Sequence, residues 1–239
     1  METLSYRDGD TDLAGLLARP AGASAANPRP GVLVAPEVTG LADHPKRRIA
    51  MLAELGYVAL AADPYGKDVA PGWENRDRMV ALKADRPALR ARFRAAYDAL
   101  AALPEVDASR MLAIGYCFGG CCVLELARMG TPVLGVASFH GLLDAPLPAG
   151  PGDIKAKVLV MTGVADPLVP FEQVQAFEEE MTAADADWQV ITYGGAGHSF
   201  TNADMKAGER PGFEFEARAD ARSWRALLDF FGETIGPAV

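Results

Sequence analysis

The sequence has few basic residues and no long hydrophobic run. Its 23 lysines and arginines are outnumbered by 32 acidic residues, which gives a formal net charge of −9. Because no basic cluster is present either, the chain lacks the charge pattern that binds nucleic acid or anionic lipid. No apolar run approaches the ~18 residues that span a bilayer. We therefore expect no nucleic-acid partner and no membrane partner.

Cysteine and histidine are scarce as well. The three cysteines, Cys117, Cys121 and Cys122, fall in one short window, which is neither an even disulfide set nor a paired CxxC metal framework. The three histidines are scattered, so the sequence predicts no metal site, and nothing in it indicates a cofactor. The start METLSYRDGD has no basic segment followed by an apolar core, so we expect a soluble, unexported, cytoplasmic protein.

What the sequence does contain is enough apolar residues for one sizeable core. Of its 239 residues, 50% are hydrophobic, and single α/β domains commonly run to roughly 200–250 residues. We expect a single domain over residues 1–239. Short Val-, Leu- and Ala-rich runs alternate with helical patterns, which predicts a mostly parallel central sheet with helices on both faces. The expected strands are residues 31–35, 57–62, 111–115, 133–139, 158–163 and 188–193.

Helical spacing predicts the packing faces of three helices between and after these runs. Segment 21–30 is typical of a Pro-rich turn, and segment 205–213 is typical of a surface loop before the last helix. The expected core-facing residues are Leu89, Phe93, Tyr97 and Leu100 in the first helix, Val174, Phe177 and Met181 in the second, and Ala217, Ala221, Trp224, Leu228 and Phe231 in the third.

The stretch GYCFGG, residues 115–120, lies between an expected strand and an expected helix. It fits the pattern glycine-x-nucleophile-x-glycine with Gly115, Cys117 and Gly119, in which the glycines let strand and helix approach closely around a strained bend. At a helix N-terminus the dipole and the free N–H groups favour a thiolate. The pattern therefore indicates a reactive thiol, and a buried structural cysteine in a glycine turn is the alternative.

Two later residues complete the set that such a bend requires. In an α/β-hydrolase the chain order is nucleophile, acid, histidine, and the last two follow later strands. Asp166 and His198 each come just after an expected strand, and His198 lies in a Gly-rich loop. His44 and His140 have no such position and are interpreted as surface or core residues. We therefore predict Cys117, Asp166 and His198 as the catalytic residues.

The chemistry of each residue type gives a mechanism. Cys117 attacks a carbonyl group and forms a thioester acyl-enzyme. His198 takes the thiol proton and later protonates the leaving group, while Asp166 holds the imidazole tautomer. The tetrahedral oxyanion is expected to bind the backbone N–H groups of Phe118 and of Val38, which lies in the loop after an early strand.

Six segments, taken together, resemble the dienelactone hydrolase family of α/β-hydrolases. They are VLVAPEVTGL, ALAADPYGK, IGYCFGG, SFHGLL, TGVADPLVP and GGAGHSFTN, and they occur in the family's order and spacing over nearly the whole chain. The resemblance implies the α/β-hydrolase fold and a triad at Cys117, Asp166 and His198. It also implies that Glu37 contacts the resting thiol and helps to generate the thiolate when substrate arrives. A carboxylate can accept that proton only if burial has raised its pKa.

The chain departs from the family where the substrate carboxylate binds. The namesake enzymes carry an arginine four residues after the catalytic histidine, and this chain has Asn202 there. Asn202 is a candidate substrate-binding residue that cannot neutralise an anion, so we expect neutral esters or lactones to be preferred. Arg76 and Arg78 lie roughly where a second arginine is expected, and Arg78 is the other candidate substrate-binding residue. A solvated loop charge is the alternative for both arginines.

The leading prediction is a cysteine-dependent hydrolase of small carboxylic esters or lactones. One alternative is a carboxymethylenebutenolidase proper, which hydrolyses dienelactone in the degradation of aromatic compounds. Another is a non-catalytic ligand-binding protein on a hydrolase scaffold. A glutaminase is disfavoured, because Ser199 and Phe200 follow His198 in place of the His-x-Glu pair. Cys121 and Cys122 are interpreted as small apolar residues packed under the bend. The sequence leaves the oligomeric state open.

Overall fold

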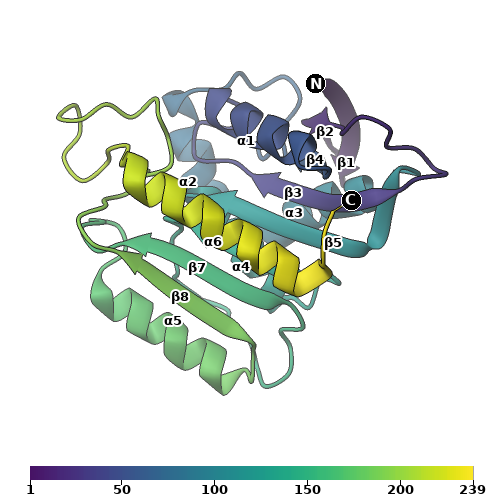
Figure 1. Cartoon of the computed structure of the whole chain (residues 1–239). Helices are drawn as coiled ribbons and strands as arrows, with labels where there is room; N and C mark the ends of the chain where they lie inside the picture. Colours follow the sequence, from purple (N-terminus) through teal and green to yellow (C-terminus); the bar gives the residue numbers. More distant parts are fainter. Residues whose placement is uncertain (239) are drawn as a thin grey trace.

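An eight-stranded sheet runs through the middle of the computed structural model, which describes residues 1–238 (Figure 1). The strand order is β1-β2-β4-β3-β5-β6-β7-β8, with antiparallel pairing of β1 with β2 and of β2 with β4, and parallel pairing elsewhere. The strands are β1 (Glu2–Asp8), β2 (Thr11–Ala18), β3 (Arg29–Ala35), β4 (Val58–Ala61), β5 (Val106–Tyr116), β6 (Gly135–Phe139), β7 (Lys157–Gly163) and β8 (Trp188–Tyr193).

All six strands expected from apolar runs are present, and the N-terminal hairpin was not predicted. The central strands are buried along nearly their whole length, which explains their continuous Val, Leu and Ala content. By contrast, β1 alternates between exposed and half-buried residues and β2 between half-buried and buried ones, and only one face of this hairpin covers the core. Its polar residues therefore gave no apolar run that a search for buried strands would find.

The helices form two layers, one on each face of the sheet (Figure 1). One layer holds α1 (Asp43–Glu54) and α6 (Ala217–Ile235), and the other holds α3 (Arg86–Ala101), α4 (Phe118–Arg128) and α5 (Phe171–Ala183). The short helices η1 (Trp73–Asn75) and α2 (Arg76–Ala84) precede α3. Within residues 1–238, no helix has both the length and the apolar character that a bilayer crossing requires.

The predicted packing faces are correct in α3 and α5 and displaced in α6. The seven residues expected to face the core in α3 and α5 are all buried. In α6 the buried residues are Ala219, Ser223, Leu227, Phe230 and Phe231, of which only Phe231 was predicted, whereas Ala217 and Ala221 are exposed. The prediction is correct for Phe231 and wrong for Ala217 and Ala221, because Ser223, a polar residue, occupies the core face. Its hydroxyl donates to the Asp220 carbonyl at 2.9 Å, which permits its burial.

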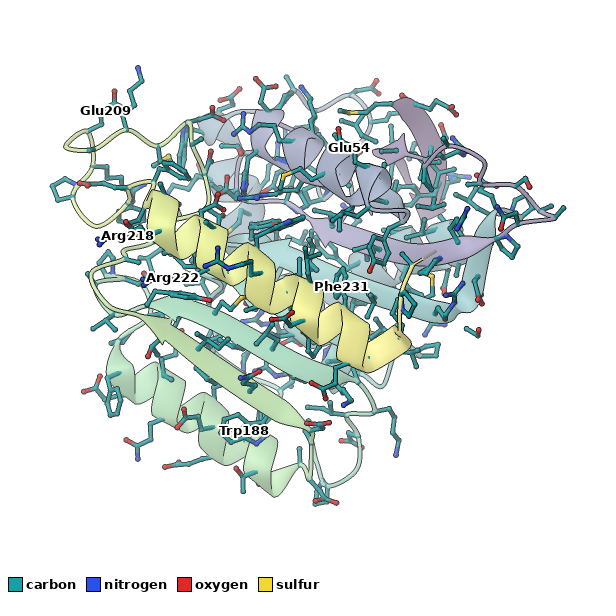
Figure 2. The ribbon with its side chains drawn as sticks, in the orientation of Figure 1. Glu54, Trp188, Glu209, Arg218, Arg222 and Phe231 are labelled. Carbon is teal, nitrogen blue, oxygen red and sulfur yellow. The ribbon has the colours of Figure 1, made fainter. Side chains whose placement is uncertain are left out.

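The loop over residues 205–213 is only partly the surface loop that was expected. Glu209 lies at its outer part and points away from the body of the protein (Figure 2). The end of the loop turns back inward, because Phe213 is buried and His198 forms an isolated bridge with it. This return places the loop beside the ends of the parallel strands, where ligands bind in sheets of this kind.

Candidate active site

Cys117 occupies a strained bend between β5 and α4. Its φ of 54° and ψ of −116° lie in a region that residues with a side chain rarely adopt. A Cβ on Gly119 would lie 2.0 Å from the Ala35 carbonyl oxygen, and one on Gly115 would lie 2.0 Å from the Gly119 carbonyl oxygen. Both glycines are therefore required by close backbone approach, as the sequence pattern predicted. The Cys117 thiol is partly exposed in a cavity.

His198 and Asp166 meet at the ends of β8 and β7. The His198 Nδ1 donates to Asp166 Oδ2 at 2.9 Å, and Asp166 Oδ1 accepts from the Leu168 amide at 2.8 Å. Both side chains are buried, and the His198 Nε2 has no hydrogen-bond partner within residues 1–238. The free nitrogen belongs to a residue that lines the same cavity as Cys117. The structure thus brings together the three residues predicted as a triad.

The charge of His198 depends on these two neighbours. Burial lowers the pKa of the imidazole, but negative charge at Cys117 and the hydrogen bond to Asp166 outweigh it and raise the pKa to about 10. A protonated imidazole beside the sulfur is the state that has received the thiol proton. The arrangement can therefore stabilise a thiolate and hold a proton for a leaving group.

The two amides expected to bind an oxyanion are available. Val38 and Phe118 line the cavity together with Cys117, and neither amide donates to an acceptor within residues 1–238. Phe118 is the first residue of α4, so its N–H is one of the free donors at a helix N-terminus. The loop that carries Val38 is fixed by Tyr65, whose hydroxyl donates to the Val38 carbonyl at 2.9 Å.

Glu37 lies in this loop, and its electrostatic state differs from the expectation. Its Oε2 accepts from Asn202 Nδ2 at 2.7 Å and lies 3.5 Å from His44 Nδ1, while Oε1 is buried without a partner within residues 1–238. Burial raises the pKa of Glu37, but His44, His198 and Asn202 together lower it below its ordinary value. The raised pKa on which a role as proton acceptor depends is therefore not found.

The cavity above the thiol has a volume of about 330 Å³ and mostly apolar walls. Arg76 and Arg210 also line it, and the Arg76 guanidinium has no hydrogen bond or ion pair within residues 1–238. Arg210 stacks over the Phe213 ring at 3.7 Å and lies 5.9 Å from the centre of the Trp73 ring. The other lining residues are Glu37, Val38, Met79, Val80, Cys117, Phe118, Leu142, Leu168, His198, Ser199 and Met205.

The two candidate substrate-binding residues lie elsewhere. Asn202 is buried outside the cavity walls, with its Nδ2 on Glu37 and its Oδ1 accepting from the Asp204 amide at 3.0 Å. Arg78 lines a separate depression beside Tyr65. The preference for neutral substrates, which was inferred from Asn202, therefore loses its structural basis. The sequence could not predict this, because nothing in the local pattern around Asn202 indicates that its amide binds Glu37 rather than substrate.

Behind the triad lies a buried polar group that the sequence left open between surface and core. His44 and His140 are both buried, and the His140 ring centre lies 5.2 Å from that of His198. Burial and the nearby charge of His198 lower the pKa of His140 well below its ordinary value, which keeps it neutral. Its Nε2 lies 2.7 Å from the Thr201 hydroxyl. No three His, Cys, Asp or Glu side chains within residues 1–238 are grouped to hold a metal ion.

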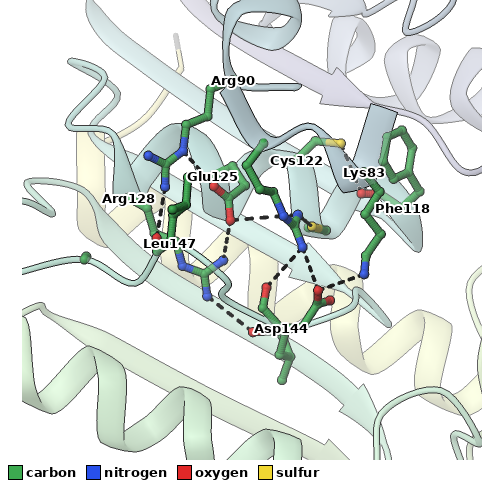
Figure 3. A network of polar contacts seen from close by, with 12 residues as sticks. Lys83, Arg90, Phe118, Cys122, Glu125, Arg128, Asp144 and Leu147 are labelled. Atoms are coloured by element: carbon green, nitrogen blue, oxygen red, sulfur yellow. Dashed lines mark hydrogen bonds and ion pairs between the residues drawn. The ribbon is translucent and has the colours of Figure 1, made fainter. Parts of the chain in front are cut away.

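Beneath the bend, Cys121 and Cys122 pack in the first turns of α4, fully buried. Cys122 donates to the Phe118 carbonyl at 3.2 Å, and Cys121 accepts from Arg86 Nη1 at 2.6 Å. Burial raises the pKa of both thiols, which keeps them protonated. Figure 3 shows the ionic network around Glu125, which Arg86 also approaches.

The comparisons with known proteins agree with this geometry. Residues 13–235 match the model of the dienelactone hydrolase family. The chain belongs to this family. Its membership makes it a hydrolase of lactones or esters, with the α/β-hydrolase fold that the sequence predicted.

Three similar proteins illustrate the family. A crystal structure described as a dienelactone hydrolase-like promiscuous phosphotriesterase from metagenomic libraries is 41% identical, with a TM-score of 0.90 over 98% of each chain. A Bradyrhizobium protein named "Probable 2-oxo-3-(5-oxofuran-2-ylidene)propanoate lactonase" is 30% identical over 72% of this chain and 73% of its own length. A Yersinia pestis protein named "Putative carboxymethylenebutenolidase" is 29% identical over 85% of this chain and 78% of its own.

Proposed function

We propose that the protein hydrolyses small carboxylic esters or lactones through a thioester acyl-enzyme on Cys117. One observation carries the proposal. The strained Cys117, the buried His198 with an unpartnered Nε2, and Asp166, 2.9 Å from the other ring nitrogen, converge at the carboxyl ends of the parallel strands β5, β8 and β7. This is the constellation that acyl transfer requires.

In the first half of the reaction, the Cys117 sulfur attacks the carbonyl carbon and a C–S bond forms. The carbonyl electron pair moves to the oxygen, where the amides of Val38 and Phe118 donate hydrogen bonds to it. The C–O bond to the leaving group then breaks, and His198 gives its Nε2 proton to the departing alkoxide. For a lactone, this hydroxyl group stays attached to the acyl chain.

In the second half, a water molecule attacks the thioester carbon while His198 takes its proton. The C–S bond breaks, the carboxylic acid leaves, and the thiol–imidazole pair is restored. Throughout both halves Asp166 accepts the Nδ1–H bond and stabilises the protonated ring. We propose that Glu37 acts through its negative charge, because its lowered pKa makes it a weak proton acceptor.

The proposal is tested by trapping the acyl-enzyme. Rapid quenching during turnover of p-nitrophenyl acetate, followed by intact-mass and peptide analysis, should give one acetyl group on Cys117. Cys117→Ala should form no adduct and lose at least ~10³-fold in kcat/KM, since the nucleophile is gone. Cys121→Ala, which removes a buried neighbouring thiol, is the matched control and should still acylate. Full activity in Cys117→Ala would sink the proposal.

A carboxylate-bearing lactone is a second candidate substrate, as in a carboxymethylenebutenolidase. The observation in its favour is the pair of cavity-lining arginines, Arg76 and Arg210, of which Arg76 has no partner within residues 1–238. Arginine binds carboxylates strongly, often through two hydrogen bonds. The ratio of kcat/KM for matched lactones with and without a carboxylate decides between the two substrate classes.

Hydrolysis of neutral phosphotriesters is a further candidate activity. It is supported by the 41% identity to the promiscuous phosphotriesterase and by the mostly apolar cavity walls. A p-nitrophenyl dialkyl phosphate is the probe. Release of p-nitrophenol by the wild type, but not by Cys117→Ala, would support this activity, and no release by either would exclude it.

A further inference from the structure

His44 lies between two charged side chains that come from different parts of the chain. Its Nδ1 is 3.5 Å from Glu37 Oε2, and its Nε2 accepts from Arg48 Nε at 3.3 Å. Arg48 also donates to the Thr201 carbonyl at 2.8 Å and forms an ion pair with Asp220 of α6. His44 and Arg48 are 2% and 5% exposed, so this row of groups is shielded from solvent until it reaches Asp220.

The contact with Arg48 fixes the tautomer of His44. A guanidinium group has only N–H donors and no acceptor, so His44 Nε2 must present its lone pair to Arg48. A ring proton is then on Nδ1, the nitrogen that faces Glu37.

Arg48 is itself held in place. Besides its ion pair with Asp220, the guanidinium lies 5.5 Å from the centre of the Tyr116 ring and 5.3 Å from that of Trp224. Such a group cannot turn away from His44 without losing several contacts at once. The orientation of the imidazole is therefore set from behind, by residues that do not reach the cavity.

We propose that His44 is a positioning residue for Glu37, held by Arg48 and Asp220 with its Nδ1 facing Glu37 Oε2 at 3.5 Å, an electrostatic contact rather than a hydrogen bond. The proposal rests on the proposed function, because Glu37 matters only if Cys117 is the nucleophile. His44 and Asn202 both approach Oε2, so Oε1 is the oxygen that has no partner within residues 1–238. In this role His44 keeps Glu37 charged and correctly oriented without touching substrate.

The proposal makes a specific demand on the pH dependence of acylation. Burial raises the pKa of Glu37, and His44, His198 and Asn202 together lower it. Without His44 the pKa of Glu37 rises, so the carboxylate becomes protonated at a higher pH. The acid limb of the acylation profile then moves to higher pH. The groups that face or surround Glu37 are His44, Arg48, Tyr116, Cys117, His198 and Asn202.

The test measures acylation of Cys117 by a p-nitrophenyl ester as a function of pH. His44→Gln keeps an acceptor for Arg48 but has no donor at the Nδ1 position, and His44→Phe keeps the ring shape but has neither nitrogen. Each should shift the acid limb of the profile to higher pH by about one unit. At pH values below the acid limbs of both proteins, the variant then acylates about tenfold more slowly than the wild type. His44→Asn, whose amide N–H lies near the Nδ1 position, should restore the limb. Glu54→Gln, at the exposed end of α1 (Figure 2), is the control.

A double-mutant cycle separates positioning from a merely structural role. In a Glu37→Gln background, replacing His44 should leave the acid limb where it is, because no carboxylate remains to titrate. The inference is overturned if His44→Gln acylates Cys117 with the wild-type profile, or if His44→Asn shifts the limb as far as His44→Gln. A wild type that forms no acyl-enzyme at Cys117 would instead overturn the proposed function together with this inference.

Discussion

Helix α4 carries Cys117 at its N-terminus and a fully buried carboxylate, Glu125, farther along (Figure 3). Glu125 Oε2 accepts from Arg90 Nε at 2.7 Å, and its Oε1 accepts from Arg128 Nη1 at 3.0 Å. Arg86 Nη1 approaches Oε1 to 3.9 Å. One carboxylate thus joins α4 to two arginines of α3. We predict that Glu125→Gln strongly destabilises the fold.

The magnitude follows from burial and from what remains after the change. A glutamine side chain has nearly the same shape as glutamate, so the variant removes charge rather than volume. Arg128 keeps its 2.7 Å ion pair with Glu180, and Arg86 keeps its 2.6 Å ion pair with Asp144. Breaking a buried ion pair from one side typically costs about 3–5 kcal/mol, and the retained pairs favour the lower end. A loss of ~3 kcal/mol is a large part of a total stability of about 5–15 kcal/mol.

Urea unfolding, followed by circular dichroism, measures this loss as a lower midpoint with an unchanged slope. Glu179→Gln makes the same chemical change at an exposed site on α5 and should stay within about 0.5 kcal/mol of the wild type. Glu125 lies eight residues beyond Cys117, about 12 Å along the helix. The folded variant should therefore acylate at nearly the wild-type rate. A loss of stability below about 1 kcal/mol would refute the reasoning.

Two further predictions concern the site itself. Gly119→Ala should lower kcat/KM by about 10²-fold or more, because its Cβ would meet the Ala35 carbonyl at 2.0 Å and displace the oxyanion loop. The control Gly232→Ala, whose Cβ would meet no atom within 4 Å, should keep full activity. Equal rates in the two variants would contradict the steric argument. His198 should titrate near pH 10 by NMR, and clearly lower in Cys117→Ala. Because the pKa of His198 is raised above its ordinary value of 6.5, protonated His198 stabilises the folded state fully below pH 6.5, and this stabilisation is lost as the pH rises through about 10. An identical titration of His198 in the wild type and in Cys117→Ala would contradict the role given to Cys117.

Local sequence patterns were sufficient for the parts of the site that follow strands. Cys117, Asp166 and His198 each lie just beyond an apolar run, and parallel strands bring their carboxyl ends to one edge of the sheet. The glycines around Cys117 were readable for the same reason, since a bend of this kind needs them at fixed spacing. The fold and the candidate triad could thus be predicted from short stretches of sequence.

The parts that could not be predicted depend on contacts between distant segments. Arg48 and Asp220 are 172 residues apart in the sequence, and no local pattern predicts that they pair. The cavity-lining Arg210 lies in a loop whose composition is typical of a solvent-exposed segment. The buried face of α6 was displaced because spacing alone does not reveal that Ser223 can satisfy its hydroxyl within the helix. Tertiary structure decides all three.

The replacement of an arginine by Asn202 acquires a physical meaning in this setting. The family's namesake enzymes carry an arginine at this position. Asn202 donates a hydrogen bond to Glu37 at 2.7 Å but contributes no charge. A buried carboxylate without a compensating charge would become protonated. Arg48 provides such a charge from the other side, since Glu37 raises the pKa of Arg48. His44 lies between the two side chains and contacts both. Arg48 and His44 thus supply what a neutral Asn202 cannot, a compensating charge near Glu37.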